Sequence, residues 1–136
     1  MPDYIDTNVI LRFLTGDPPG MAEQAAALFA AVERGEITLR IEPVVIAETV
    51  WVLKSFYGFS PVEISRVLQE FLGHEGLVAA EKPALLLALQ YFAEQNIDFV
   101  DALVAARMRL QGVSVIYSFD RHFDRIAGIQ RKIPGV

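Results

Sequence analysis

Short strand-like segments alternate with helical segments along the whole of this 136-residue chain. The residue pattern predicts strands at 3–6, 37–41, 77–80, 113–117 and 130–133. It predicts helices at 7–15, 21–34, 43–56, 60–73, 83–95 and 98–112. Strands that are separated by helices form parallel sheets through right-handed crossovers, with helices on both faces. The sequence therefore predicts an α/β fold with a central parallel sheet of four to five strands.

Length and composition predict one domain that spans residues 1–136. The chain has no repeat or long linker that would divide it. No cysteine is present, which excludes disulfides, thiol catalysis and cysteine-bound zinc and is typical of a reducing cytoplasm. The N-terminus lacks a signal-peptide pattern, and no apolar run approaches the roughly 20 residues of a membrane span. We therefore expect a cytoplasmic protein without a membrane segment.

Four carboxylates lie in or directly after apolar segments, where an unpaired charge is costly: Asp6, Glu48, Asp101 and Asp120. Asp6 and Asp120 follow predicted strands, and parallel α/β sheets bind ligands at the carboxyl ends of their strands. Glu48 is the only charge between Pro43 and Leu53. Carboxylate oxygens are preferred ligands of hard divalent cations. The four acids therefore predict a shared cation site with a catalytic use.

Several of these acids also have structural explanations. Asp6 suits the N-cap of the helix that begins at Thr7. Asp98 suits the N-cap of the last long helix, and Asp101 in its first turn would then complement the helix dipole. Glu48 is harder to explain, because its helix offers no obvious polar face. We interpret Glu48 and Asp101 as ligands and Asp98 as a cap that also supports the site.

The segment after the strand at 113–117 carries further polar side chains. Ser118 and Asp120 are two residues apart, so both are expected to face the same site. Asp124 is one helical turn beyond Asp120, and it either joins the site or pairs with Arg121 or Arg125. His122 is interpreted as a surface or packing residue rather than a ligand.

Four motifs contain the candidate acids: Asp6-Thr-Asn-Val-Ile-Leu11, Glu48 in a helix, Asp101-Ala-Leu103 and Ser118-Phe-Asp-Arg-His-Phe-Asp124. In these four motifs the chain resembles the PIN-domain family. The greatest similarity is to VapC-type toxins of bacterial and archaeal toxin–antitoxin pairs, and it extends over essentially the whole chain. The resemblance implies a three-layer α/β/α sandwich, Mg²⁺ or Mn²⁺ dependence, and endoribonuclease activity that leaves a 5′-phosphate and a 3′-hydroxyl. It also implies a homodimer that a cognate antitoxin of a type II pair wraps and silences.

Carried over residue by residue, the resemblance implies an acidic catalytic and metal-binding quartet of Asp6, Glu48, Asp101 and Asp120. It implies polar support from Asn8 and Ser118. The chain departs from the family at His122, where many relatives carry an acidic residue or Lys. That departure leaves Asp98 and Asp124 open as further metal ligands.

A net charge of −5 opposes binding to RNA, because phosphate contacts are made largely by Lys and Arg. A metal and a local arginine cluster would have to offset this repulsion. The candidates for binding the RNA backbone are Arg12, Arg107, Arg109, Arg121 and Arg125. Arg121 and Arg125 lie nearest the acidic motif in sequence. For each arginine, a solvated or salt-bridging role is the alternative.

Two other functional classes compete with the nuclease. The first is an inactive PIN-like binding module, which would have no need for an intact acidic quartet. The second is a domain that accepts a phosphoryl group on an Asp, which would require a lysine at the site, and Lys54, Lys82 and Lys132 are not suitably placed. Aromatic residues at helix ends are candidates either for the core or for a surface covered by a dimer mate or antitoxin helix: Phe13, Phe56, Tyr57, Phe59 and Phe71.

Overall fold

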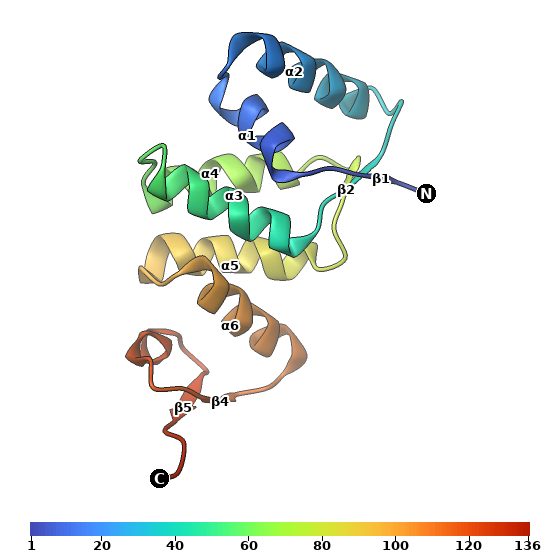
Figure 1. Cartoon of the computed structure of the whole chain (residues 1–136). Helices are drawn as coiled ribbons and strands as arrows, with labels where there is room; N and C mark the ends of the chain where they lie inside the picture. The colour runs from blue at the N-terminus through green and yellow to red at the C-terminus, as the bar shows by residue number, and fades with distance from the viewer. The chain divides into compact units, whose positions relative to one another are not determined.

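The computed structural model describes residues 1–136, which form two compact units. The N-terminal unit comprises Met1–Lys82 and the C-terminal unit comprises Pro83–Val136. Figure 1 traces both units from the blue N-terminus to the red C-terminus. None of the helices is both long enough and apolar enough to cross a membrane.

The N-terminal unit contains a three-stranded parallel sheet and four helices. The strands, in sheet order, are β1 (Asp3–Tyr4), β2 (Leu39–Arg40) and β3 (Leu77–Val78). The helices are α1 (Thr7–Thr15), α2 (Pro19–Glu33), α3 (Pro43–Ser55) and α4 (Pro61–Leu72). In the register of the sheet, Leu39 is opposite both Asp3 and Leu77.

The C-terminal unit is built from two helices, a short 3₁₀ helix and a parallel strand pair. Its elements are α5 (Lys82–Gln95), α6 (Phe99–Gln111), β4 (Val115–Tyr117), η1 (Arg121–Arg125) and β5 (Gln130–Lys132). Strand β5 runs parallel to β4, so that Ile116 is opposite Arg131. This register brings the C-terminal strand beside the segment that leads to Asp120.

The α/β class and the parallel pairing of the strands agree with the sequence prediction, and all six predicted helices are present. A single sheet of four to five strands is not confirmed, because the five strands form one sheet of three and another of two. Each strand is only two or three residues long. Because each strand is so short, it exposes few backbone N–H and C=O groups with which a further strand could pair.

Local signals in the sequence account for the helix boundaries. Helix α4 begins with a capping box, in which the Ser60 hydroxyl accepts from the Glu63 amide at 3.1 Å and the Glu63 carboxylate accepts from the Ser60 amide at 3.2 Å. Helix α3 begins with Pro43 in its first turn, as predicted. Helix α2 begins at Pro19, two residues before the predicted start, because proline also suits the first turn of that helix.

The core of the N-terminal unit contains a cluster of three phenylalanine rings from α1, α2 and α4. The ring centroid of Phe29 lies 4.5 Å from that of Phe13 and 5.2 Å from that of Phe71. Phe71 therefore belongs to the core, whereas Phe56 at the end of α3 is exposed. Gly76 precedes β3 at a close approach, since a Cβ there would lie 2.5 Å from the Val32 side chain.

Candidate functional site

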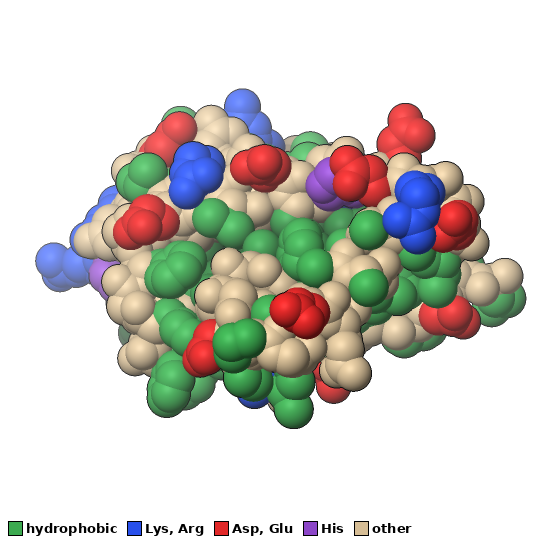
Figure 2. Space-filling view, turned by 90° about the horizontal axis from the view of Figure 1, so that it is seen from above, with side chains coloured by type: hydrophobic (Ala, Val, Ile, Leu, Met, Phe, Trp, Pro, Cys, Tyr) green, Lys and Arg blue, Asp and Glu red, His purple; other side chains and the backbone are tan.

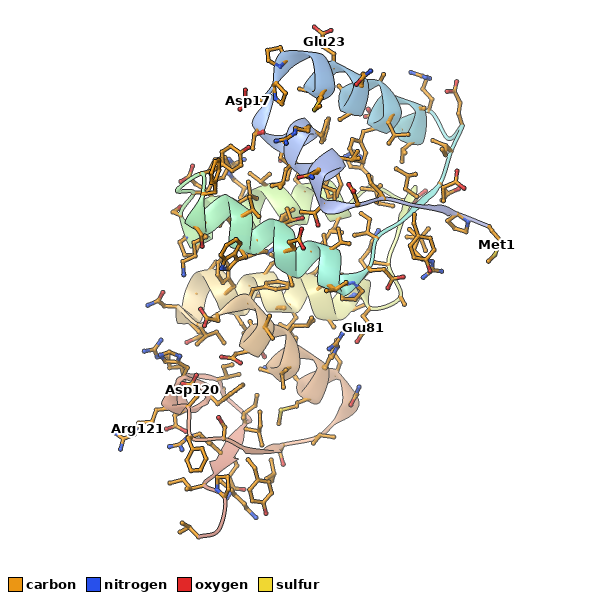
Figure 3. The ribbon with its side chains drawn as sticks, viewed as in Figure 1. Met1, Asp17, Glu23, Glu81, Asp120 and Arg121 are labelled. Carbon is orange, nitrogen blue, oxygen red and sulfur yellow. The ribbon has the colours of Figure 1, made fainter.

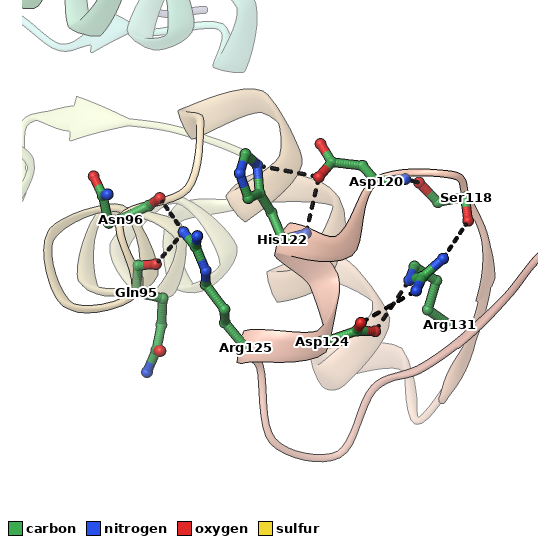
Figure 4. Close-up of polar contacts among 8 residues, drawn as sticks. All are labelled: Gln95, Asn96, Ser118, Asp120, His122, Asp124, Arg125 and Arg131. Atoms are coloured by element: carbon green, nitrogen blue, oxygen red, sulfur yellow. Dashed lines mark hydrogen bonds and ion pairs between the residues drawn. The ribbon is translucent and has the colours of Figure 1, made fainter.

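Local hydrogen bonds orient Asp120 between β4 and η1. The Ser118 hydroxyl accepts from the Asp120 amide at 2.9 Å, and Asp120 Oδ1 accepts from the His122 amide at 2.8 Å (Figure 4). Asp120 is thus the N-cap of η1, as Figure 3 shows at the start of that helix. The carboxylate is held in one orientation with its other oxygen available, and the Ser118 hydroxyl supports the segment as an acceptor.

His122 lies closer to the acids than the sequence suggested. Its Nδ1 is 3.1 Å from Asp120 Oδ1, and its side chain is about half exposed, at 45%. The contact has the distance of an ion pair but not the angle of a hydrogen bond, so Nδ1 is left without a hydrogen-bond partner. A protonated His122 would therefore offset negative charge at Asp120.

Asp101 lies in the first turn of α6 and is half-buried. Burial raises the pKa of Asp101, and the nearby carboxylates of Asp120 and Asp98 raise it further, while His122 acts in the opposite direction. The negative charges of Asp120 and Asp98 therefore oppose the ionisation of Asp101. The helix approaches its neighbours closely because Ala102, Ala105 and Ala106 are fully buried.

The prediction that Asp98 caps α6 with its side chain was wrong. Asp98 occupies the N-cap position, and its carbonyl accepts from the Ala102 amide at 2.9 Å, but its side chain makes no capping hydrogen bond. The backbone of Asp98 begins the helix without help from the carboxylate. That carboxylate therefore contributes charge to the Asp101 environment rather than a cap.

The raised pKa of Asp101 predicts a pH-dependent stability. The pKa of Asp101 in the folded state lies above the ordinary value of an aspartate. Between these two pKa values, folded Asp101 holds a proton that the unfolded chain has released, and the free energy of unfolding therefore falls as pH rises through this range. We expect Asp101→Asn to melt at a higher temperature than wild type at neutral pH in chelator, with the difference shrinking below about pH 4. Thermal melts across pH test this expectation. A lower melting temperature for the variant at neutral pH would contradict it.

Asp124 pairs with Arg131, and not with Arg121 or Arg125, which the sequence offered as one of two alternatives. Arg131 Nε donates to Asp124 Oδ1 at 3.0 Å, and a second guanidinium nitrogen donates to Oδ2 at 3.2 Å (Figure 4). This bidentate hydrogen bonding and the positive charge of Arg131 lower the pKa of Asp124. Both oxygens of Asp124 are thereby engaged, which argues against Asp124 as a further metal ligand.

Arg131 was not identified as a site residue from the sequence. Its guanidinium also donates to the Ser118 carbonyl at 3.1 Å, and its contacts therefore hold both ends of the segment that contains Asp120. The sequence predicted a strand at 130–133 but not its register. Only the pairing of β5 with β4 places Arg131 beside Ser118.

In the N-terminal unit, Asp6 has the structural role that the sequence left open. It is the N-cap of α1, and its Oδ1 accepts from the Val9 amide at 3.3 Å. Asn8 is exposed and lines a cavity of about 500 Å³ between α1 and α2. Neither side chain is buried, so neither pays a large desolvation cost.

Glu48 is exposed, although its apolar neighbours in the sequence suggested that α3 had no polar face. Ile46, Val50 and Leu53 face the core. Glu48 lies on the opposite, solvent-facing side of the helix, together with Val44 and Trp51. The energetic argument from burial was therefore wrong for Glu48, because that solvent face carries apolar side chains and does not appear polar in the sequence.

The arginines selected as RNA contacts have varied surroundings. Arg125 donates to the carbonyls of Gln95 and Asn96 at 3.2 and 2.7 Å, which ties η1 to the end of α5. Arg12 donates to the Asp17 carbonyl at 3.5 Å, and Arg109 donates to the Tyr91 hydroxyl at 3.3 Å. Arg107 is half-buried. Arg121 is exposed and extends away from the ribbon beside Asp120 (Figure 3).

Of the four predicted metal ligands, Asp6 and Glu48 belong to the N-terminal unit, and Asp101 and Asp120 belong to the C-terminal unit. No group of three or more His, Cys, Asp or Glu side chains is placed to hold a metal ion. Mg²⁺ nevertheless binds proteins through one or two carboxylates and completes its shell with water and phosphate oxygens. Asp101 and Asp120 provide such a pair of mutually repelling carboxylates. The chemistry of this donor set fits a hard divalent cation.

Comparison with known proteins assigns the family. The family model of the PIN domain matches residues 4–129 and thus extends over both units. No curated protein matches the chain. PIN domains are usually nucleases that use a divalent metal, which agrees with the acidic character of the candidate site. Since the match includes nearly the whole sequence, the chain belongs to the PIN-domain family.

Proposed function

We propose that this PIN-domain protein is a Mg²⁺- or Mn²⁺-dependent endoribonuclease, the toxin of a type II toxin–antitoxin pair in the cytoplasm. The observation that carries the proposal is the repulsion that Asp120 and Asp98 exert on Asp101. Carboxylates in such an arrangement are stabilised by a cation, and the family match assigns the chain to a nuclease-type fold. The toxin role rests on the motifs alone.

In this proposal, Asp101 and Asp120 bind the metal in the C-terminal unit, and Asp6 and Glu48 serve the same reaction. Ser118 and Arg131 hold Asp120 in place through the hydrogen bonds described above. Asn8 supports Asp6, and Asp98 adds negative charge near Asp101. When bound, a divalent ion would lower the pKa of a water molecule and offset charge on the scissile phosphate.

Further parts of the proposal follow from the resemblance to VapC-type toxins. We propose that residues 1–136 function as a single PIN-like domain with a three-layer sandwich, as a homodimer with a cognate antitoxin. Arg121 is the best candidate for a phosphate contact, since it is exposed directly beside Asp120. Arg12, Arg107 and Arg125 remain further candidates, although Arg125 already donates to two backbone carbonyls.

A second candidate is a PIN-like binding module without catalysis. Incubation of the protein with structured RNA in Mg²⁺, Mn²⁺ or chelator separates the two functions. The nuclease is expected to cleave only with metal and to leave a 5′-phosphate and a 3′-hydroxyl. Cleavage that persists in chelator would contradict a metal-dependent nuclease. Binding without cleavage in both metals would identify the binding module.

A further inference from the structure

Helix α3 presents a stripe of exposed side chains that includes Glu48. Val44, Glu48, Trp51 and Ser55 recur at spacings of four, three and four residues, which places them on one face of a helix, and all four are exposed. Val44 is 71% exposed and Trp51 is 67% exposed. The opposite face of α3 packs into the core of the N-terminal unit. A large aromatic side chain thus lies one helical turn from a proposed catalytic acid.

An indole ring in water is costly and is typical of a surface that contacts another molecule. A protein partner lying over this stripe would also bury Glu48 and would have to supply a cation that pairs with its carboxylate. A nucleobase can instead lie flat on the indole ring while the carboxylate stays in contact with water and metal. The composition of the stripe therefore favours a nucleic-acid base over a protein surface.

We propose that Trp51 stacks on an unpaired base of the RNA substrate and positions the strand beside Glu48. This inference rests on the proposed nuclease function and adds a positioning residue to it. Stacking on aromatic rings supplies binding energy that needs no positive charge. It therefore addresses the difficulty that a chain with a net charge of −5 has in binding a polyanion.

The C-terminal unit provides an independent parallel. Phe119 directly precedes Asp120 and is 76% exposed. An exposed aromatic side chain thus accompanies a proposed acid in each unit, Trp51 near Glu48 and Phe119 next to Asp120. Aromatic residues beside backbone-binding groups are the usual means by which proteins hold single-stranded nucleic acid.

Trp51 is the only tryptophan in the chain, so its fluorescence reports directly on stacking. We expect single-stranded oligoadenylate to quench this emission in a saturable manner when Ca²⁺ replaces the catalytic metal. The binding constant is obtained separately from the anisotropy of a dye-labelled oligonucleotide. Trp51→Leu is expected to weaken binding about five- to 150-fold, whereas Trp51→Phe should retain most of it.

Phe56→Leu is the matched control. Phe56 is also an exposed aromatic at the end of α3, but it lies outside the stripe, so its loss should leave RNA binding unchanged. In cleavage assays with Mn²⁺, Trp51→Leu should raise KM with a smaller effect on kcat, and Trp51→Phe should restore KM. A merely structural role would lower the melting temperature of Trp51→Leu and would not separate KM from kcat.

Different results would contradict the stacking role of Trp51 and the proposed nuclease activity. If the wild type cleaves RNA but oligoadenylate leaves its emission unchanged and Trp51→Leu keeps the wild-type KM, the stacking role is wrong. If Trp51→Leu instead changes the sedimentation coefficient of the free protein, the stripe contacts a second copy of the chain, and the inference is overturned. Quenching by RNA without cleavage would support stacking and contradict the nuclease.

Discussion

Replacement of Asp120 by Asn is expected to reduce RNA cleavage at least about a hundredfold, because residues that only support metal ligands already contribute roughly 10- to 100-fold. Asparagine keeps the size of the side chain and the oxygen that accepts from the His122 amide at 2.8 Å. The substitution therefore removes charge rather than structure. Cleavage rates with Mn²⁺ should fall while the melting temperature in chelator stays the same or rises.

Asp6→Asn and Glu23→Gln provide the comparison. Asp6→Asn removes another acid of the proposed quartet and should also abolish cleavage, while Asn serves as well as Asp at an N-cap. Glu23→Gln removes an exposed acid of α2 and should behave as wild type. If Asp120→Asn and Asp6→Asn both retained full activity, the metal-nuclease proposal could not stand. If Asp6→Asn melted clearly lower in chelator, Asp6 would be chiefly a structural cap.

Phe29→Ala is expected to destabilise the N-terminal unit by roughly 3–5 kcal/mol, the usual cost of truncating a buried phenylalanine. Phe29 is only 7% exposed and contacts the rings of both Phe13 and Phe71. Its removal leaves a void among side chains from three helices. Urea denaturation followed by circular dichroism should show a lower midpoint with little change in slope.

Phe13→Ala is the control for this effect. Phe13 belongs to the same cluster but is 37% exposed, so less apolar surface is lost from the interior and the decrease should be clearly smaller. Equal losses for the two variants would mean that the cluster does not stabilise the unit through burial. Neither residue belongs to the proposed quartet, so RNA cleavage at low temperature should survive both changes.

Helices were predictable from the sequence because their signals are local. The capping box at Ser60, proline in the first turn of α3 and periodic apolar residues each act within a few residues. The sheets were less predictable, because strands of two or three residues carry little pattern and their pairing depends on distant segments. Arg131 illustrates this limit, because only the pairing of β5 with β4 places its side chain beside Ser118.

Among the candidate acids, too, some features could be predicted from the sequence and others could not. Asp120 lies close enough to Asp101 for its charge to raise the pKa of Asp101, and this proximity depends on how α6 packs near η1. Glu48 was selected for an energetic reason that the structure removes, since the residue is exposed. Apolar sequence neighbours do not imply burial when a helix leaves valine and tryptophan on its solvent face. Asp98 and Asp124 were misjudged because hydrogen-bond partners of side chains are not encoded by spacing.

The contacts of Arg131 have a consequence for local unfolding. Arg131 lies in strand β5 and holds both Ser118 and Asp124 on either side of Asp120. Any opening that detaches β5 from β4 therefore also removes the guanidinium that holds the segment around Asp120. Hydrogen exchange of the Ser118 amide, which donates to the Lys132 carbonyl at 3.0 Å, would report the fraction of molecules in which that acid is no longer held.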